Sequence, residues 1–314
     1  MRTSRARWVR SLPILAVIAM VAGGCTDDGG APASASGGSE PDGEAIESQE
    51  VTIVAVDYAF TEAPVELQSG VIQLHFENHG TVPHEIVLDG IGDTPLDQVV
   101  VGSRGLDFGD PFPEFIDQVV IPTPVSAKGG EGFDATFTLS EGRYALFCNL
   151  DIAPKGEKKT RHLDLGMIRE LTVVGGDGGL ELPEADGTIT ASDHAFDIDL
   201  EAGDRTVNFL NEGPDEVHVA TVELYTEDVS AEEAEEAYAL RLEPGKPPQG
   251  TPMAEAGLGF SGIFSSGLGS TFRLFDGGAF ESGRTYLFVC ILSDRAGGDP
   301  HAKAYGMYEA VTIE

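Results

Sequence analysis

A cysteine, a histidine and a methionine recur in the same order at two places in the chain. The two sets are Cys148, His162 and Met167, then Cys290, His301 and Met307. A tyrosine stands four residues before the cysteine both times. A buried cysteine can act as a small hydrophobe, with the histidine and methionine filling space nearby. The recurrence of all three types in one order favours a shared chemical role instead.

The resemblance between the two regions continues upstream. "DYAF" at 57–60 matches "DHAF" at 193–196, and "LHFENHGTVPHEIVL" matches "VNFLNEGPDEVHVATV". The chain is therefore an internal duplication. Each copy also has a histidine on the strand after a turn that contains glycine and proline, His84 in the first copy and His218 in the second. Four residue types thus recur in the order His, Cys, His, Met.

These four types have a specific chemistry. Two imidazoles and a thiolate in a plane, with a weak thioether on the axis, form a site that suits both oxidation states of copper. The early histidine comes from a distant strand, so the fold must close before the site exists, and metal binding would stabilise the closed form. The sequence predicts up to two type 1 copper ions, held by eight ligands: His84, Cys148, His162, Met167, His218, Cys290, His301 and Met307.

At these residues the sequence resembles the cupredoxins, the family of small blue copper proteins. The resemblance covers about residues 49–176 and 187–314, and "HLDLGM" matches the family's spacing from histidine to methionine. The second histidine follows the cysteine by more residues than in many small cupredoxins, and "HAKAYGM" is one residue longer than "HLDLGM". The resemblance implies a β-sandwich and one type 1 copper site in each copy.

Both copies consist of short β-rich runs separated by Gly, Pro, Asn and Asp. We therefore expect an all-β fold of two tandem Greek-key sandwiches, residues 49–176 and 187–314, joined by a linker at 177–186. A short helix is expected in an insertion in each copy. Thr94 is the predicted cap of the first helix, with Pro95 in its first turn, and Ser230 with Glu233 has the capping-box spacing for the second.

The beginning of the chain is typical of an export signal. "MRTSRARWVR" has four arginines and no acid, and the apolar stretch that follows is shorter than the ~20 residues of a membrane span. Residues 1–24 are predicted to be a signal peptide, and Cys25 to be the lipid-modified first residue of a bacterial lipoprotein; plain secretion is the alternative. Residues 25–48 have the composition of a disordered tether. The protein is thus expected on the extracytoplasmic face of a bacterial membrane, held by a lipid anchor.

The formal net charge of −34 at pH 7 excludes nucleic acid as a partner. Such a surface would attract a redox partner with a basic docking surface, in a salt-dependent encounter. A generally solvated surface that only favours solubility is the equally open alternative.

The count of histidines bears on whether the protein is an enzyme. The two predicted sites use four of the seven, which leaves His75, His79 and His194. A multicopper oxidase needs many more, and copper nitrite reductases have a histidine directly before the copper cysteine, where this chain has Phe147 and Val289. We therefore expect no catalytic residues and favour electron transfer. Copper storage, buffering or delivery is the alternative, and a copper oxidoreductase is less favoured.

Overall fold

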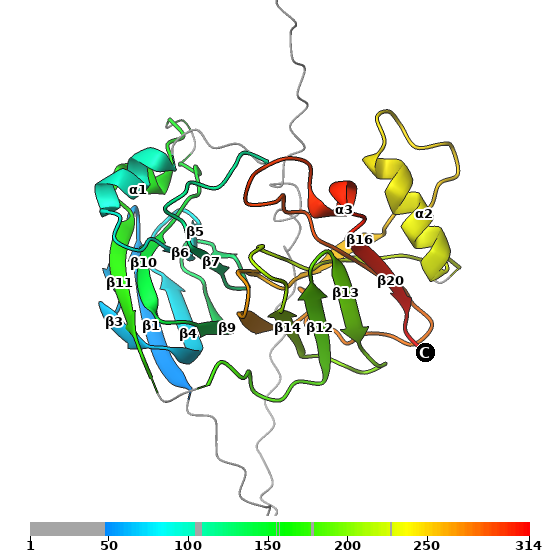
Figure 1. Cartoon of the computed structure of the whole chain (residues 1–314), viewed down its shortest axis with the longest axis horizontal. Coiled ribbons are helices and arrows are strands. Elements are labelled where there is room, and N and C mark those ends of the chain that lie inside the picture. Colours follow the sequence, from blue (N-terminus) through cyan, green and yellow to red (C-terminus); the bar gives the residue numbers. More distant parts are fainter. Residues whose placement is uncertain (1–47, 104–108, 155, 157, 177–178, 227) are drawn as a thin grey trace, which may run out of the picture. The chain divides into compact units, whose positions relative to one another are not determined.

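The computed structural model describes residues 48–314 except 104–108, 155, 157, 177–178 and 227. Cys25, the predicted signal peptide and nearly all of the predicted tether lie outside the described residues. Residues 45–314 form one compact unit, and Figure 1 shows its two β-rich halves side by side. The predicted all-β class with short helical insertions is confirmed.

The first half contains eleven strands and a helix among its described residues. They are β1 Gln49–Val56, β2 Ala59–Glu62, β3 Glu66–Gln68, β4 Gly70–Asn78, β5 His84–Glu85, β6 Val87–Gly90, α1 Leu96–Gly102, β7 Gln118–Ile121, β8 Ser126–Ala127, β9 Gly132–Leu139, β10 Gly142–Phe147 and β11 Ile168–Val174. A 3-10 turn, His162–Leu165, precedes β11. Side chains alternate across β4, where Leu74 and Phe76 are buried and His75 between them is exposed.

The second half repeats this arrangement in its described residues. Its elements are β12 Gly187–Ser192, β13 Ala195–Asp199, β14 Val207–Asn211, β15 Thr221–Leu224, α2 Ala231–Leu242, β16 Ala256–Phe260, β17 Ile263–Phe264, β18 Gly269–Phe272, β19 Thr285–Val289, α3 His301–Ala304 and β20 Tyr308–Thr312. The sandwich strands recur in matching roles. β1 and β4 pair in parallel in the first half, as β12 and β14 do in the second.

The two halves share a sheet. Eight strands run in the order β13-β12-β14-β18-β9-β4-β1-β2, so β18 of the second half pairs with β9 of the first. A six-stranded sheet, β17-β7-β6-β10-β11-β3, also takes one strand, β17, from the second half. The second half completes its own sandwich with the four-stranded sheet β16-β15-β19-β20. In the first half, β5 and β8 form a separate two-stranded sheet. One continuous cluster of buried apolar side chains extends through both halves.

The two predicted helix starts differ in outcome. Ser230 caps α2 as predicted: its hydroxyl accepts from the Glu233 N–H, and the Glu233 carboxylate accepts from the Ser230 N–H. The predicted Thr94 cap is wrong. Pro95, which is extended at φ −65° and ψ 145°, occupies the cap position of α1, and no side chain bonds the first turn. A proline fixes φ and supplies no side-chain acceptor, so it ends the extended segment without capping the helix.

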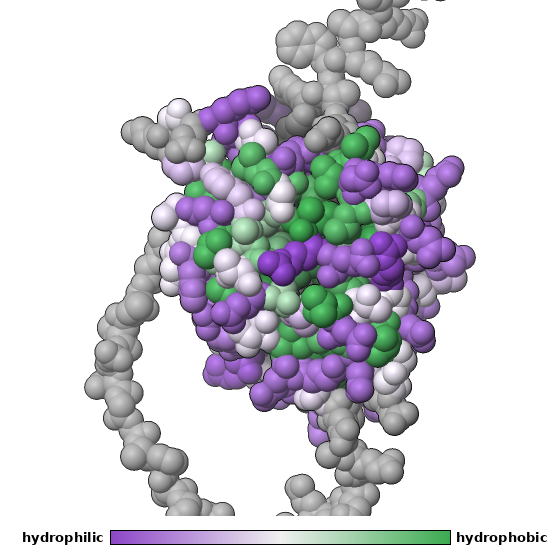
Figure 2. Space-filling view, turned by 90° about the vertical axis from the view of Figure 1, so that its left-hand side faces the viewer, coloured by the Kyte–Doolittle hydropathy of each residue, from purple (hydrophilic) through white to green (hydrophobic). Residues whose placement is uncertain are grey.

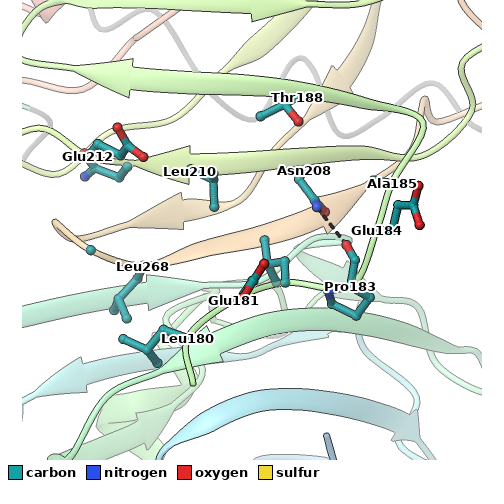
Figure 3. A pocket seen from close by; sticks show the side chains of 13 residues that line it. Leu180, Glu181, Pro183, Glu184, Ala185, Thr188, Asn208, Leu210, Glu212 and Leu268 are labelled. Carbon is teal, nitrogen blue, oxygen red and sulfur yellow. Dashed lines mark hydrogen bonds between the residues drawn. The ribbon is translucent and has the colours of Figure 1, made fainter. Parts of the chain in front are cut away.

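The described part of the predicted linker packs against the sheet. Leu182 is buried, and the Asn208 amide on β14 donates to the Pro183 carbonyl (Figure 3). Leu180 to Ala185 and the outer side of β12 and β14 line a shallow pocket. The linker therefore covers sheet surface in the second half.

The surface of the described residues is mixed. Figure 2 shows one face of the first half, where apolar areas are crossed by a band of hydrophilic residues. The large apolar side chains that are most exposed lie apart in the sequence, at Val65, Val101 and Met253. Single exposed apolar residues are normal on soluble proteins. No helix among the described residues is both long and apolar enough to cross a membrane.

Candidate metal centres

Three of the four predicted ligands in the first half form a compact triangle, which we call centre 1. His84 lies on β5, Cys148 directly follows β10, and His162 begins the 3-10 turn. The Cys148 Sγ is 3.3 Å from the His162 Nδ1 and 3.9 Å from the His84 Nδ1, and the two Nδ1 atoms are 3.0 Å apart. All three side chains are fully buried.

The second half forms the matching triangle, centre 2. The Cys290 Sγ is 3.7 Å from the His218 Nδ1 and 3.4 Å from the His301 Nδ1. Cys290 follows β19 and His301 begins α3, while His218 pairs with Phe264 in an isolated bridge. These three side chains are also fully buried. In Figure 1, β5 and α3 both lie toward the top of the view.

The sulfur-to-nitrogen separations fit one metal ion inside each triangle. Bonds of about 2.3 Å to sulfur and about 2.0 Å to nitrogen, at three corners of a plane, would separate sulfur from nitrogen by about 3.7 Å. The observed sulfur-to-nitrogen distances are 3.3–3.9 Å in centre 1 and 3.4–3.7 Å in centre 2. Both triangles also present the nitrogen Nδ1 from both imidazoles. This donor set of one thiolate and two imidazoles is the one that type 1 copper takes.

The outer nitrogens help to set how the rings are oriented. The His162 Nε2 donates to the Ile152 carbonyl at 2.8 Å, so the lone pair is left on Nδ1, facing the cysteine. The His301 Nε2 lies 3.1 Å from a carboxylate oxygen of Asp294. A carboxylate oxygen of Asp57 lies 3.9 Å from the His84 Nε2, beyond hydrogen-bond distance. A bond such as the one from His162 to the Ile152 carbonyl commonly fixes the tautomer of a metal-binding histidine.

Both predicted axial methionines are buried next to the cysteines in the same apolar cluster. The N–H of Met167 donates to the His162 carbonyl at 3.0 Å, and the N–H of Met307 donates to the His301 carbonyl at 3.2 Å. The backbone bond from the methionine to the late histidine is therefore the same in both halves, although the second loop has one more residue. The structure thus brings together the three predicted donors of each triangle, and it ties the backbone of each predicted axial methionine to the histidine and cysteine of its half.

Burial shifts the pKa values of the ligands in the metal-free protein. It lowers the pKa of His84 and of His218 to about 4, aided in each case by the neighbouring histidine, so both imidazoles are neutral near pH 7. Burial raises the pKa of Cys148 to about 12 and that of Cys290 to about 11. The thiols therefore keep their protons until a cation binds. Metal binding at neutral pH should release protons from the cysteines.

Two asparagines hold the loops that carry the early histidines, and the sequence reasoning missed them. The Asn78 amide donates to the carbonyls of Val82 and Ala127, which lie beside the first loop. Asn211 makes the matching bonds to Glu216 and Phe264. Both asparagines are buried. The two asparagines recur in the matching segments "ENHG" and "LNEG", and this repetition could have identified them from the sequence.

The three remaining histidines lie outside both triangles. His194 packs beside centre 2, with its ring 5.3 Å from that of His301, as Tyr58 packs 4.9 Å from the His162 ring in centre 1. His75 lies on the exposed side of β4 and bonds Asp134 and Glu77. His79 is exposed and bonds the same Glu77. The described residues hold one further group of potential ligands, Glu216 and Asp294 with His301.

Fold and donors together define an all-β protein of two similar halves, each with a His–Cys–His triangle and a buried methionine. No protein-family model and no curated protein matches the sequence. Among solved structures, the chain is similar to an auracyanin from Roseiflexus castenholzii, with 20% identity over 40% of this chain and 96% of that one and a TM-score of 0.28.

Two similar structures extend over both halves. A blue copper oxidase from Nitrosomonas europaea has 14% identity over 85% of this chain and 86% of its own, with a TM-score of 0.25. A copper nitrite reductase from the same organism has 15% identity over 85% and 94%, with a TM-score of 0.25. These scores are too low to carry conclusions about function, so the copper assignment rests on the donor atoms.

Proposed function

We propose that the chain is an exported copper protein that is tethered to a membrane and transfers electrons through one type 1 copper centre in each half. The observation that carries this proposal is the pair of buried triangles with Nδ1, Sγ and Nδ1 at their corners. Each triangle lies beside a buried methionine. Bound copper would supply exchange of single electrons.

The ligand set favours redox work over delivery. A plane of two nitrogens and a thiolate, with a weak axial thioether, serves both oxidation states of copper, whereas softer sulfur-rich sites favour the reduced ion. All six ligands in the two triangles have no exposed surface. A buried, preorganised site holds its ion through a redox cycle and offers an acceptor protein no route to the ligands. Storage or delivery of copper is the alternative proposal.

Partner and location belong to the same proposal. The net charge of −34 would draw a redox partner with a basic surface, which makes the encounter rate fall as salt rises. Lipid on Cys25 would place the copper domains at the extracytoplasmic face of a bacterial membrane. Changing Cys25 to alanine should release the protein into the soluble fraction or block its processing, and unchanged membrane retention would contradict the anchor.

The deciding experiment measures copper through a redox cycle. The purified protein, loaded with copper, is expected to hold two ions, to show the absorption and paramagnetic-resonance spectrum of type 1 copper, and to keep both ions through repeated reduction and reoxidation beside a modest chelator. Loss of copper on reduction would leave storage or delivery as the function. Absence of the type 1 spectrum would remove the electron-transfer proposal.

A further inference from the structure

The two centres differ at the outer nitrogen of their late histidine. Ile152 and Asp294 occupy the same position, four residues after the cysteine of their half. In centre 1 the His162 Nε2 meets the Ile152 backbone carbonyl. In centre 2 the His301 Nε2 meets the Asp294 side chain, with its Oδ1 3.1 Å away and off the line of an ideal hydrogen bond. A neutral partner is thus replaced by a carboxylate.

Tyr305 holds that carboxylate in place. Its hydroxyl donates to the Asp294 Oδ2 at 2.5 Å, and its ring stacks on His194 with centroids 3.7 Å apart and planes 7° apart. Tyr305 stands directly before the glycine and methionine that end the second loop, where the first loop has Leu165. Where His194 lies, the first half has Tyr58. Three replacements, of Ile152 by Asp294, of Leu165 by Tyr305 and of Tyr58 by His194, therefore meet at the outer side of one ligand.

A carboxylate at this position has a defined effect on a metal ligand. It makes the imidazole a stronger base and adds negative charge near the ion, which favours the higher oxidation state. Asp294 is largely shielded from water, with 27% of its side chain exposed, so solvent screens its charge only in part.

We propose that Asp294, held by Tyr305, lowers the reduction potential of centre 2. Both are positioning residues that act through His301, and the inference rests on the proposed copper function. The potentials to be compared are all those of centre 2, so Asp57 and Glu85, the acids beside centre 1, are the same in every comparison.

The test is a redox titration of the copper-loaded protein carrying the Cys148→Ser change, so that centre 2 alone contributes the type 1 signal. Asp294→Asn is expected to raise the midpoint potential by at least the equivalent of a tenfold change in the reduction equilibrium, ~59 mV for one electron. Asp299→Asn is the matched control. It removes the same charge from the same loop, at an exposed side chain that pairs with Lys303 at 2.8 Å.

Tyr305→Phe gives a second test without a change of charge. It removes the bond to Asp294 and keeps the ring on His194, so the midpoint should rise by less than in Asp294→Asn. In the metal-free protein, nitrogen NMR should show that Asp294→Asn changes the His301 Nε2 resonance and that Asp299→Asn does not. Equal midpoints for Asp294→Asn and Asp299→Asn would overturn the inference. A parent protein without a type 1 signal would instead overturn the proposed function.

Discussion

The backbone N–H of Cys148 donates to the carbonyl of Met167 at 3.2 Å, and the same bond joins Cys290 to Met307 at 3.1 Å. The residue that ends each ligand loop is therefore tied to the residue that begins it. This closure keeps the methionine beside the thiol, although the loops differ in length. It gives the methionine a fixed place in each centre.

The proposed axial role of Met167 predicts a change in potential without loss of metal. Met167→Leu should raise the midpoint potential of centre 1 by about the equivalent of a tenfold change in the reduction equilibrium, ~59 mV, because the loss of a weak axial donor destabilises the more highly charged oxidised ion more than the reduced one. Met253→Leu, at a methionine that is 57% exposed, is the control. Redox titration with copper analysis measures both quantities. Loss of copper in Met167→Leu would show that the methionine holds the ion.

The thiolate assignment predicts a strict count of ions. Cys148→Ser and Cys290→Ser should each remove one copper ion and about half of the thiolate-to-copper charge-transfer absorption, and the double variant should remove both. Each single variant serves as the control for the other half. Metal analysis with absorption spectroscopy of the folded protein gives the result. A double variant that keeps its colour would contradict the ligand assignment.

Asp89 predicts a pH dependence of stability. It lies buried on β6, and burial raises its pKa to about 7, against the opposing effect of Arg295 from the second half. The folded chain therefore holds this proton more tightly than the unfolded chain does. The contribution of Asp89 to the free energy of unfolding is present below about pH 4, the pKa of the unfolded carboxyl, and is lost as the pH rises to about 7. The loss is on the order of 4 kcal/mol.

Asp89→Asn should remove this dependence. Urea unfolding of the metal-free protein at pH 5 and pH 8 measures it, with the exposed Asp93→Asn as the control. As the pH rises from 5 to 8, the parent should lose unfolding free energy relative to the Asp89→Asn variant. A difference that stays the same at both pH values would show that Asp89 is not protonated in the folded protein.

Phe264 tests whether the two halves unfold together. Its side chain is fully buried, and its strand β17 pairs with β7 of the first half. Phe264→Ala should cost about 3–5 kcal/mol. Because the core is continuous, the loss should appear in one transition of the whole protein by circular dichroism. Phe275→Ala, at a phenylalanine that is 37% exposed, should have a much smaller effect. Two separate transitions would contradict the shared core.

The sequence predicted most of the two centres because the ligand types repeat in order, and repetition at two places distinguishes ligands from ordinary core residues. The capping box of Ser230 was equally local and equally readable. The carboxylate of Asp294 was not predicted, because the first copy has Ile152 at this position and the contact with His301 depends on how the second loop folds. The shared sheet was not predicted either. Pairing between β9 and β18 joins residues more than 130 positions apart, and no local pattern encodes that register.

β9 and β18 are equivalent strands of the two copies, since each pairs with its own half's β4 or β14. They pair antiparallel, with Thr136 opposite Thr271. Two equivalent strands in this arrangement are related by a local twofold axis, which is the contact that identical subunits make in a symmetric dimer. The duplicated chain thus contains, within one polypeptide, the interface of a homodimer of single halves. A single half would expose the edge of β9 and should associate with a second copy through it.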